Sequence, residues 1–345
     1  MRLASVITPL SDENLALAAQ TGVSDITIRY QGPQLADWLP VRDQVERHGL
    51  KICTVEDALQ TEQIIMGSSG RDEEIEGIKQ LLQVMSELEI PVLCYNFMAG
   101  TDWVRTSVSE PERGGARVTG FDLSQVDQAV SLDDASVQLE HREISADKLW
   151  ENLAYFLEAV IPEAERLGIA LAMHPDDPPL DEFMGRARIM NSVEGFERLV
   201  GLVPSRSNGI CFCQGTFAEI GVDIPATIRQ LGPHIRYVHC RDVRGQRDCF
   251  VETFHDNGPT DMVAAIRAYK EIGFTGSIRP DHVPQLEGEE DGEPVDSNTV
   301  TISNTAPTVT DVAISPDPAY ADDTLTCSWT FGDDDDDEDA STLEW

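Results

Sequence analysis

Apolar residues recur along most of this chain in short runs that alternate with longer amphipathic stretches. The runs predict strands, and the stretches have the i, i+3, i+4 spacing of helices. The stretch 71–88, for example, has apolar residues at 75, 78, 81, 82 and 85. The predicted strands are residues 3–8, 23–29, 50–55, 90–97, 169–174, 209–213, 235–240 and 276–279. The predicted helices are residues 11–20, 35–48, 71–88, 145–167, 192–203, 225–231 and 260–272.

This alternation indicates a parallel sheet, because each return to a parallel strand needs a crossover. Eight strands is the number that closes a (β/α)8, or TIM, barrel of about 250 residues. An open doubly wound sheet is the alternative, but no glycine-rich dinucleotide fingerprint follows the first strand. We therefore predict an α/β fold, a TIM barrel, in residues 1–287.

Two regions depart from the alternation. Residues 98–144 are rich in Gly, Ser, Thr, Asp and Arg and carry only a weak strand signal. No helical period follows the eighth strand, so we expect a barrel without its last helix. Residues 288–345 begin as an acidic linker, continue with β-like alternation and include a pure acidic run at 333–339. We expect this tail to be a partial immunoglobulin-like β segment.

The net charge of the chain limits which classes of molecule it is expected to bind. The net charge is −37, and residues 283–345 hold 18 acidic and no basic residues, which leaves −19 on the rest of the chain. Nucleic acid is not an expected partner, because phosphate binding needs clustered Lys and Arg. No apolar run is long enough for a membrane span, and the start of the chain lacks a secretory signal. The acidity fits either plain solubility or a saline interior.

Four of the predicted strands end in side chains that bind metals. The fifth, sixth and seventh end at His174, Cys213 and His239, and Asp281 follows the eighth. Functional residues of a barrel lie at the carboxyl ends of its strands, so these four should meet on one rim. Each alone could be a satisfied polar residue, a small core residue or a helix cap. Together they predict a site for Zn²⁺, Fe²⁺ or Mn²⁺.

Further polar side chains flank the same rim. Asn96, Trp103 and Arg105 follow the fourth strand, and Arg241 follows the seventh. Arginines at this place suit an anionic substrate through paired contacts with a carboxylate. An ion-pair network with acidic neighbours is the alternative for the arginines. We expect the four residues to bind the substrate.

The stretch S-I-R-P-D-H (277–282) delivers an arginine, a carboxylate and an imidazole at the end of one short strand. Such a strand is a poor core strand but a good place for a metal and a proton carrier. We therefore expect Arg279 and His282 to be catalytic. No Ser/His/Asp nucleophile signature and no phosphate loop occur.

At these residues the chain resembles the mannonate dehydratases, over about residues 1–287. The matching stretches are I-P-V-L-C-Y-N-F-M (90–98), D-W-V-R-T (102–106), R-G-G-A (113–116), A-M-H-P-D-D-P-P (172–179), G-I-C-F-C-Q-G (209–215), Y-V-H-C-R-D (237–242) and S-I-R-P-D-H (277–282). The resemblance implies a TIM barrel related to the xylose-isomerase-like sugar enzymes, with Mn²⁺ or Fe²⁺ as cofactor. It places an acid/base histidine at His282 and the metal ligands at His174, Cys213, His239 and Asp281.

The resemblance also implies the reaction. It is the dehydration of D-mannonate to 2-dehydro-3-deoxy-D-gluconate, a cytoplasmic step of hexuronate (glucuronate) catabolism. A metal-dependent sugar isomerase or epimerase on the same barrel is the alternative, as is an inactive metal-binding remnant. The expected partner is thus a small sugar acid, and assembly into a homo-oligomer stays open.

The resemblance breaks off after the eighth strand. The family continues there with a loop that carries a catalytic tyrosine and then with a closing helix. In this chain no tyrosine occurs between His282 and Tyr320. We therefore expect a truncated or fused chain that binds metal and turns over weakly or not at all.

Overall fold

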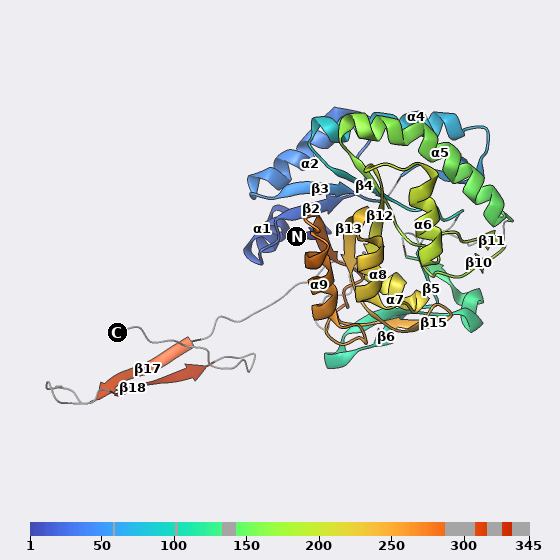
Figure 1. Ribbon diagram of the computed structural model, residues 1–345. Helices are drawn as coiled ribbons and strands as arrows, with labels where there is room; N and C mark the ends of the chain where they lie inside the picture. Colours follow the sequence, from blue (N-terminus) through green and yellow to red (C-terminus); the bar gives the residue numbers. More distant parts are fainter. Residues whose placement is uncertain (58, 101–102, 133–142, 287–307, 316–325, 333–345) are drawn as a thin grey trace. The chain divides into compact units, whose positions relative to one another are not determined.

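The computed structural model describes the chain except residues 58, 101–102, 133–142, 287–307, 316–325 and 333–345, and gives the backbone alone for 308–315 and 326–332. Its centre is a closed barrel of eight parallel strands (Figure 1). The strands are β1 (Arg2–Val6), β2 (Asp25–Ile28), β3 (Lys51–Val55), β4 (Val92–Tyr95), β9 (Ala170–Met173), β12 (Asn208–Cys213), β13 (Ile235–Cys240) and β16 (Ser277–Pro280). They pair in the order β1-β16-β13-β12-β9-β4-β3-β2, which confirms the predicted TIM barrel.

Helices connect the barrel strands. The seven predicted ones are α1 (Asp12–Gln20), α2 (Leu35–Arg47), α4 (Arg71–Glu87), α5 (Ala146–Leu167), α6 (Val193–Leu202), α8 (Ile224–Leu231) and α9 (Met262–Glu271). Their starts follow local chemistry: the side chains of Ser11, Ser145 and Ser192 each accept a hydrogen bond from a first-turn N–H. Two further helices, α3 (Glu62–Met66) and α7 (Gln214–Ile220), are too short to show a helical period in the sequence.

The stretch 98–144 is more regular, in its described residues, than the sequence indicated. It contains β5 (Val104–Arg105), β6 (Ser107–Pro111), β7 (Arg117–Asp122) and β8 (Val130–Ser131), with short 3-10 turns at Arg113–Gly115 and Leu123–Gln128. β6 and β7 join β14 (Val243–Gln246) and β15 (Cys249–Glu252) in a four-stranded sheet of order β14-β15-β7-β6. The expectation of a long irregular break was wrong for this part, because β7 pairs not only with the nearby β6 but also with β15, which lies far away in the sequence.

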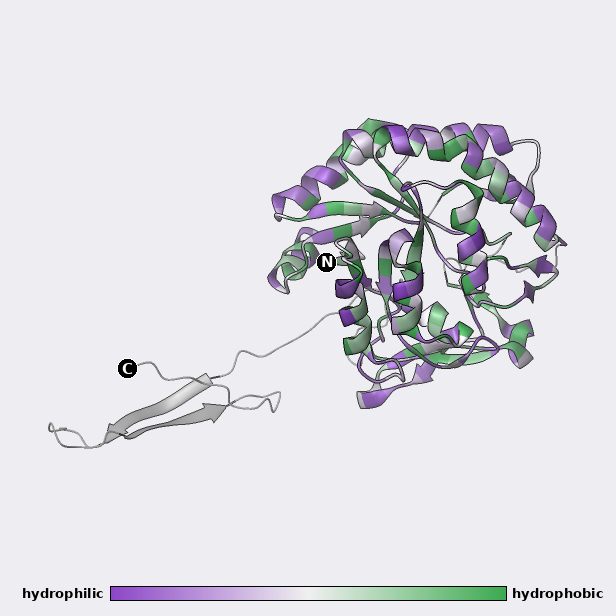
Figure 2. Ribbon diagram, in the orientation of Figure 1, coloured by the Kyte–Doolittle hydropathy of each residue, from purple (hydrophilic) through white to green (hydrophobic). Residues whose placement is uncertain are grey.

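Of the three hydrophobic clusters in the described residues, two hold these parts together, and the third lies inside the barrel. The larger lies between barrel and helices and includes Trp38, Phe156 and Phe196, each at most 2% exposed. The smaller packs β5, β7 and β15 against the loop after β9, where the short pair β10 (Glu182–Phe183) and β11 (Arg186–Ala187) lies, and includes Phe121 and Phe250. Figure 2 shows mainly hydrophobic barrel strands and helices that carry both kinds of residue, as amphipathic helices on a barrel must.

After β16 the described chain runs to Leu286, and no helix occurs between β16 and that residue. Gln285 instead pairs with Arg117 in an isolated bridge. The chain divides into two compact units, residues 1–300 and 301–345. The second unit contains an antiparallel pair, β17 (Thr308–Ser315) and β18 (Thr326–Gly332). The predicted boundary at 287/288 lies outside the described residues.

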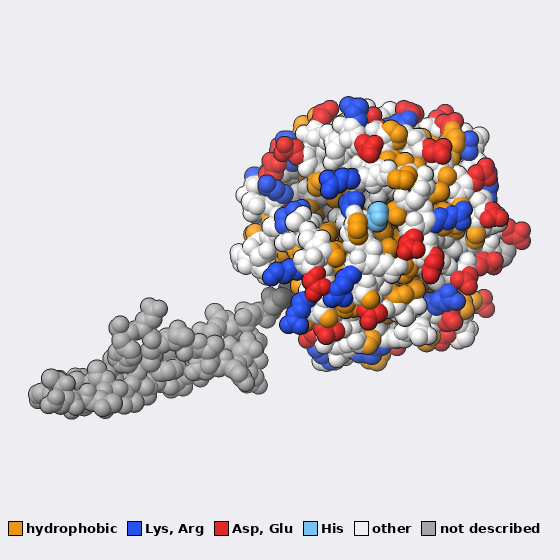
Figure 3. All heavy atoms as spheres, viewed as in Figure 1, with side chains coloured by type: hydrophobic (Ala, Val, Ile, Leu, Met, Phe, Trp, Pro, Cys, Tyr) orange, Lys and Arg blue, Asp and Glu red, His pale blue; other side chains and the backbone are white. Residues whose placement is uncertain are grey.

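The face of the first unit seen in Figure 3 carries acidic and basic side chains interspersed, with single hydrophobic groups between them. This mixed surface is that of a globular domain in water. Among the described residues, no helix has the length and apolar character needed to cross a membrane.

Candidate active site

The four predicted ligand residues lie together at the carboxyl end of the barrel. His174 follows β9, Cys213 ends β12, His239 is the penultimate residue of β13, and Asp281 follows β16. Side chains alternate along a strand, so Cys213 lies on the same face of β12 as Cys211, the face that lines the barrel interior. All four side chains are buried, with exposed fractions of 0–5%. We call them the ligand cluster.

Distances within the ligand cluster are short. Nε2 of His174 lies 3.2 Å from Nδ1 of His239, and that Nδ1 lies 3.5 Å from Oδ2 of Asp281. Sγ of Cys213 lies 3.9 Å from the same Oδ2. One donor atom each from His174, Cys213 and His239 lies within 4.8 Å of the other two. Such spacings suit donors around one divalent ion with bonds of roughly 2.0–2.3 Å.

His174 is oriented to offer Nε2 to a metal. Its Nδ1 lies 2.7 Å from the carbonyl oxygen of Pro175, and only an N–H can donate to a carbonyl. In the neutral ring, Nε2 then keeps the free lone pair, which is the usual arrangement of a metal-binding histidine. Burial alone would lower the pKa of His174, but the neighbouring Cys213 thiolate raises it to about 9. A metal would therefore displace a proton from this ring.

Cys213 is held as a thiolate by its surroundings. Its Sγ lies 3.3 Å from Nε of Arg241 and 3.3 Å from the hydroxyl of Thr216. Burial would raise the pKa of this thiol, but the charges of Arg241 and His174 bring it well below its usual range. The thiolate is the form that binds metals.

Glu56 is a member of this site that the sequence analysis missed. It directly follows β3, so the rule applied to the later strand ends could have found it. Its Oε1 lies 3.0 Å from Nε2 of His239, and its Oε2 lies 3.3 Å from Nη2 of Arg279. Nη1 of Arg279 in turn lies 2.8 Å from Oδ1 of Asp281. Arg279 is thus clamped between two carboxylates, with 7% of its side chain exposed.

His282 is the most accessible imidazole next to the ligand cluster. Its side chain is 13% exposed, and its backbone has a φ of 47°, in the left-handed region. Nδ1 lies 3.3 Å from Oε1 of Glu252, and Nε2 lies 3.9 Å from Oδ2 of Asp281. The same Nδ1 lies 3.5 Å from Nη2 of Arg105, so it has both an acceptor, Glu252, and a donor, Arg105, beside it. Nε2 is the ring nitrogen on the side of Asp281.

Arg105 and Arg241 form a buried ion-pair network. Nη1 of Arg105 lies 2.7 Å from Oδ1 of Asp177, and its Nη2 lies 2.8 Å from Oε1 of Glu252. Arg241 contacts the same two carboxylates, at 2.5 Å and 2.6 Å, and lies 3.1 Å from Glu219. Both arginine side chains are at most 1% exposed. The observed contacts of Arg105 and Arg241 are ion pairs with acidic neighbours, which is the alternative that the sequence analysis left open for these arginines. Their contact with substrate stays a prediction.

The two other predicted substrate residues lie nearer the solvent. The side chain of Asn96 is half-buried, and its Oδ1 accepts a hydrogen bond of 3.1 Å from the backbone N–H of Met98. Trp103 is half-buried too and packs edge-on against the ring of His174, with centroids 5.6 Å apart. Contact of Asn96 and Trp103 with substrate stays a prediction.

The donor set fits a borderline divalent ion. Two imidazoles, one thiolate and one carboxylate are ligands of Zn²⁺, Fe²⁺ or Mn²⁺, and this set alone does not select among them. One ring nitrogen, Nε2 of His239, is buried without a hydrogen-bond partner in the described structure. This nitrogen lies 3.0 Å from Oε1 of Glu56, on the other side of the ring from the Nδ1 that faces His174 and Asp281.

Comparison with known proteins identifies the family of this chain. The family model of D-mannonate dehydratase (UxuA) matches residues 19–306. The mannonate dehydratase of Oceanobacillus iheyensis is 35% identical over 269 residues, which cover 72% of this chain and 77% of that protein. The mannonate dehydratase of Streptococcus agalactiae serotype Ia is 36% identical over 271 residues, covering 72% and 78%.

Solved structures extend the comparison to the fold. The crystal structure of mannonate dehydratase from Streptococcus suis serotype 2 superimposes with a TM-score of 0.77 at 30% identity, over 87% of this chain and 90% of that one. The likeness to the 3-keto-D-glucoside 4-epimerase of E. coli, with a TM-score of 0.58 at 12% identity, shows a shared barrel alone. The extent of the family match and the identity to its curated members decide the assignment: this chain belongs to the D-mannonate dehydratase family.

Proposed function

We propose that this chain removes water from D-mannonate to give 2-dehydro-3-deoxy-D-gluconate, with Mn²⁺ or Fe²⁺ bound by His174, Cys213, His239 and Asp281. The observation that carries the proposal is the convergence of these four side chains from four neighbouring strand ends. Membership of the dehydratase family supports the reaction over isomerisation or epimerisation, since the likeness to epimerases extends to the fold alone.

The reaction needs two proton transfers. A proton leaves the carbon next to the carboxylate, and a hydroxide leaves the following carbon and is released as water after taking up a proton. The resulting enol then becomes the 2-keto acid. A bound divalent cation supplies Lewis-acid stabilisation of the negative charge that develops on substrate oxygens. The chain itself must supply the groups that move protons.

His282 is the residue we assign to proton transfer. It is next to a proposed ligand in the sequence, is partly exposed, and is held through Nδ1 by Glu252. A neutral Nε2 can accept a proton, and the same nitrogen can return it to the leaving hydroxide. A positioned acid/base group of this kind contributes about 10²–10⁴-fold in rate.

The remaining predicted residues have positioning or binding roles in this proposal. Arg279 holds Asp281 through an ion pair of 2.8 Å and so fixes one proposed ligand. Asn96 and Trp103 are the half-buried rim residues that we assign to the substrate. Arg105 and Arg241 are paired with Asp177 and Glu252 behind the site, and we propose that substrate binding draws on one of these guanidinium groups.

The direct test is product analysis. Purified protein is incubated with D-mannonate and added Mn²⁺ or Fe²⁺, and formation of a 2-keto-3-deoxy acid is followed. The expected result is metal-dependent product with D-mannonate and none with neutral ketoses. The His282→Asn variant should keep metal and lose turnover. Epimerised ketose products without keto acid would overturn the proposal in favour of an epimerase.

A pathway and a place in the cell follow from the substrate. D-mannonate is an intermediate of hexuronate catabolism in the family that the sequence resembles, so we propose this route and a cytoplasmic location.

A further inference from the structure

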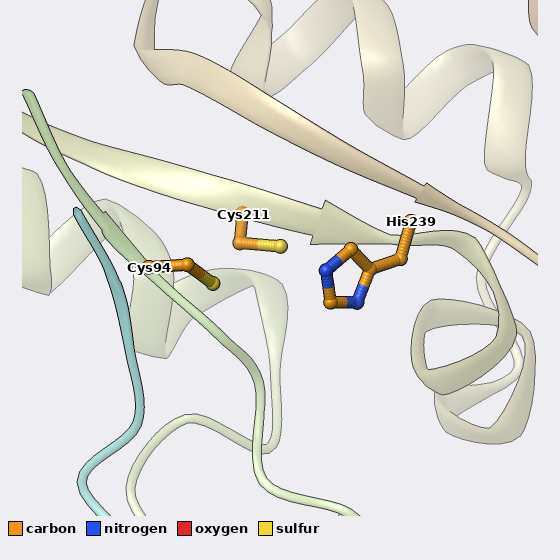
Figure 4. A group of neighbouring side chains, drawn as sticks. All are labelled: Cys94, Cys211 and His239. Atoms are coloured by element: carbon orange, nitrogen blue, oxygen red, sulfur yellow. The ribbon is translucent and has the colours of Figure 1, made fainter. Parts of the chain in front are cut away.

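A second group of potential metal ligands lies beside the ligand cluster, and apart from the shared His239 the proposed reaction does not use it. It consists of Cys94 on β4, Cys211 on β12 and the ring of His239 (Figure 4). One donor atom from each residue lies within 4.8 Å of the other two. In Figure 4 the sulfur of Cys211 points toward the imidazole of His239, and the sulfur of Cys94 lies on the same side of the ring. We call this group the dithiol site.

His239 offers a different ring nitrogen to each group. Its Nδ1 faces His174 and Asp281, at 3.2 Å and 3.5 Å. Its Nε2 points the opposite way, lies 3.0 Å from Oε1 of Glu56, and has no hydrogen-bond partner. The same Oε1 lies 3.6 Å from Sγ of Cys94. The carboxylate oxygen of Glu56 therefore lies next to two of the three donors of the dithiol site.

The dithiol site is closed to water and contains unsatisfied atoms. The exposed fractions of Cys94, Cys211 and His239 are 1%, 0% and 1%. Nε2 of His239 and Oε2 of Glu56 are both buried without a hydrogen bond. Both atoms nevertheless have charged neighbours, because Oε1 of Glu56 lies 3.0 Å from the nitrogen and Nη2 of Arg279 lies 3.3 Å from the oxygen. A bound cation would take the place of a proton between His239 and Glu56.

The spacing fits a small soft cation. The three donor atoms lie no more than 4.8 Å apart. A point equally far from the corners of a triangle with sides of that length lies about 2.8 Å from each corner, which is the side divided by √3. Zn–S and Zn–N bonds are shorter, at about 2.3 Å and 2.0–2.1 Å. Contraction by roughly half an ångström completes the site, which side-chain rotation can supply. Thiolates are soft ligands that prefer Zn²⁺ or Cd²⁺ over Mn²⁺.

We propose that Cys94, Cys211, His239 and Glu56 form a second, buried site for a thiophilic divalent cation of the Zn²⁺ class. This site shares only His239 with the ligand cluster, which contains a single thiol, Cys213. Its occupant is selected by softness, because two of the four donors are sulfur.

The test counts thiolates bound to Cd²⁺ through their ultraviolet charge-transfer absorption. The Cys213→Ser background removes the only thiol of the ligand cluster. In that background one equivalent of Cd²⁺ should give the absorption of two thiolates. Adding Cys94→Ser and Cys211→Ser should abolish this absorption. The matched control adds Cys53→Ser and Cys240→Ser instead, which also removes two thiols of the barrel, and should retain it.

An unchanged absorption in the Cys94/Cys211 variant, or none in the Cys213→Ser background, would overturn the proposal. If the triple variant does not fold, crystals of the unaltered protein soaked in Zn²⁺ give the answer. Anomalous scattering should place an ion about 2.3 Å from both sulfurs. Zinc bound only at the ligand cluster would contradict the proposed second site. Neither measurement uses D-mannonate, so the outcome is independent of the proposed dehydratase activity.

Discussion

At the scale of single residues, Cys213 decides the character of the ligand cluster. It is the softest of the four proposed ligands, and its contacts with Arg241 and Thr216 keep it ionised. Cys213→Ser replaces the thiolate by a neutral hydroxyl of nearly the same shape. We expect metal affinity to fall by more than the roughly 10–100-fold typical of losing an outer-shell partner. Metal content after dialysis measures this, and Cys53→Ser is the control. Equal metal retention in both variants would remove Cys213 from the site.

Glu252 makes stability dependent on pH. Burial alone would raise its pKa, but Arg241 and His282 lower it to about 2 from an ordinary value of 4.5. A carboxyl group with a lowered pKa stabilises the fold above its unfolded pKa and loses that contribution as pH falls toward the folded value. The shift corresponds to roughly 3 kcal/mol at pH 7, of which about 2 kcal/mol is lost by pH 3.

Urea unfolding of metal-free protein at pH 7 and pH 3 measures this dependence. Glu252→Gln should be less stable at pH 7, because it leaves Arg105 and Arg241 short of a carboxylate. It should also lose about 2 kcal/mol less than the unaltered protein between pH 7 and pH 3. The exposed Glu158→Gln should behave like the unaltered protein. An acid dependence that is the same in all three proteins would contradict our interpretation of Glu252.

At the scale of elements, α7 sets the position of Arg241. A Cβ on Gly215, in the first turn of α7, would lie 2.5 Å from Cγ and 2.6 Å from Nε of Arg241. Gly215→Ala should therefore push the guanidinium away from Cys213 and Asp177 and destabilise the protein by about 1–3 kcal/mol.

Gly201→Ala is the matched control for this change. Gly201 also lies in a helix, α6, but a Cβ there meets no atom within 4 Å. Alanine should be neutral or stabilising by up to about 1 kcal/mol at such a position. Thermal unfolding compares the two variants, and metal content should fall only in Gly215→Ala. Equal effects of both substitutions would show that α7 does not fix Arg241.

At the scale of the whole molecule, we expect the two units to be energetically independent. The first unit has its own closed barrel and two cores, and the second contains the β17–β18 pair. Removing residues 301–345 should leave the melting temperature of the barrel unchanged within a few degrees and its metal content unaltered. Limited proteolysis should cut between Gly288 and Asn304 and leave the barrel intact. A large loss of barrel stability on removal would make the tail part of the fold.

The segment that follows β16 affects the expected rate of dehydration. The family that the sequence resembles carries a catalytic tyrosine after the eighth strand, and this chain has none between His282 and Tyr320. Losing one of two proton carriers lowers a rate by about 10²–10⁴-fold. We therefore expect slow, metal-dependent dehydration, raised by grafting a family-type segment with its tyrosine after His282. A turnover rate equal to that of the relatives would show that another residue of this chain transfers the proton in place of the tyrosine.

The sequence by itself determined the barrel and the strand-end residues. Strand and helix periods are local, so each run of apolar residues could be recognised on its own, and eight alternations left few topologies. The rule that functional side chains follow barrel strands then predicted which residues would meet: His174, Cys213, His239 and Asp281.

Tertiary structure decided what those residues contact. Three contacts of the site join residues more than 100 positions apart in the sequence. They are the pairing of β7 with β15, the ion pair of Arg279 with Glu56, and the ion pair of the buried Arg105 with Glu252. The dithiol site depends in the same way on β4, β12 and β13 closing around one interior. Local sequence patterns cannot predict such contacts. The burial of a side chain, its ion pairs and the direction of each ring nitrogen are set only when distant strands pack together.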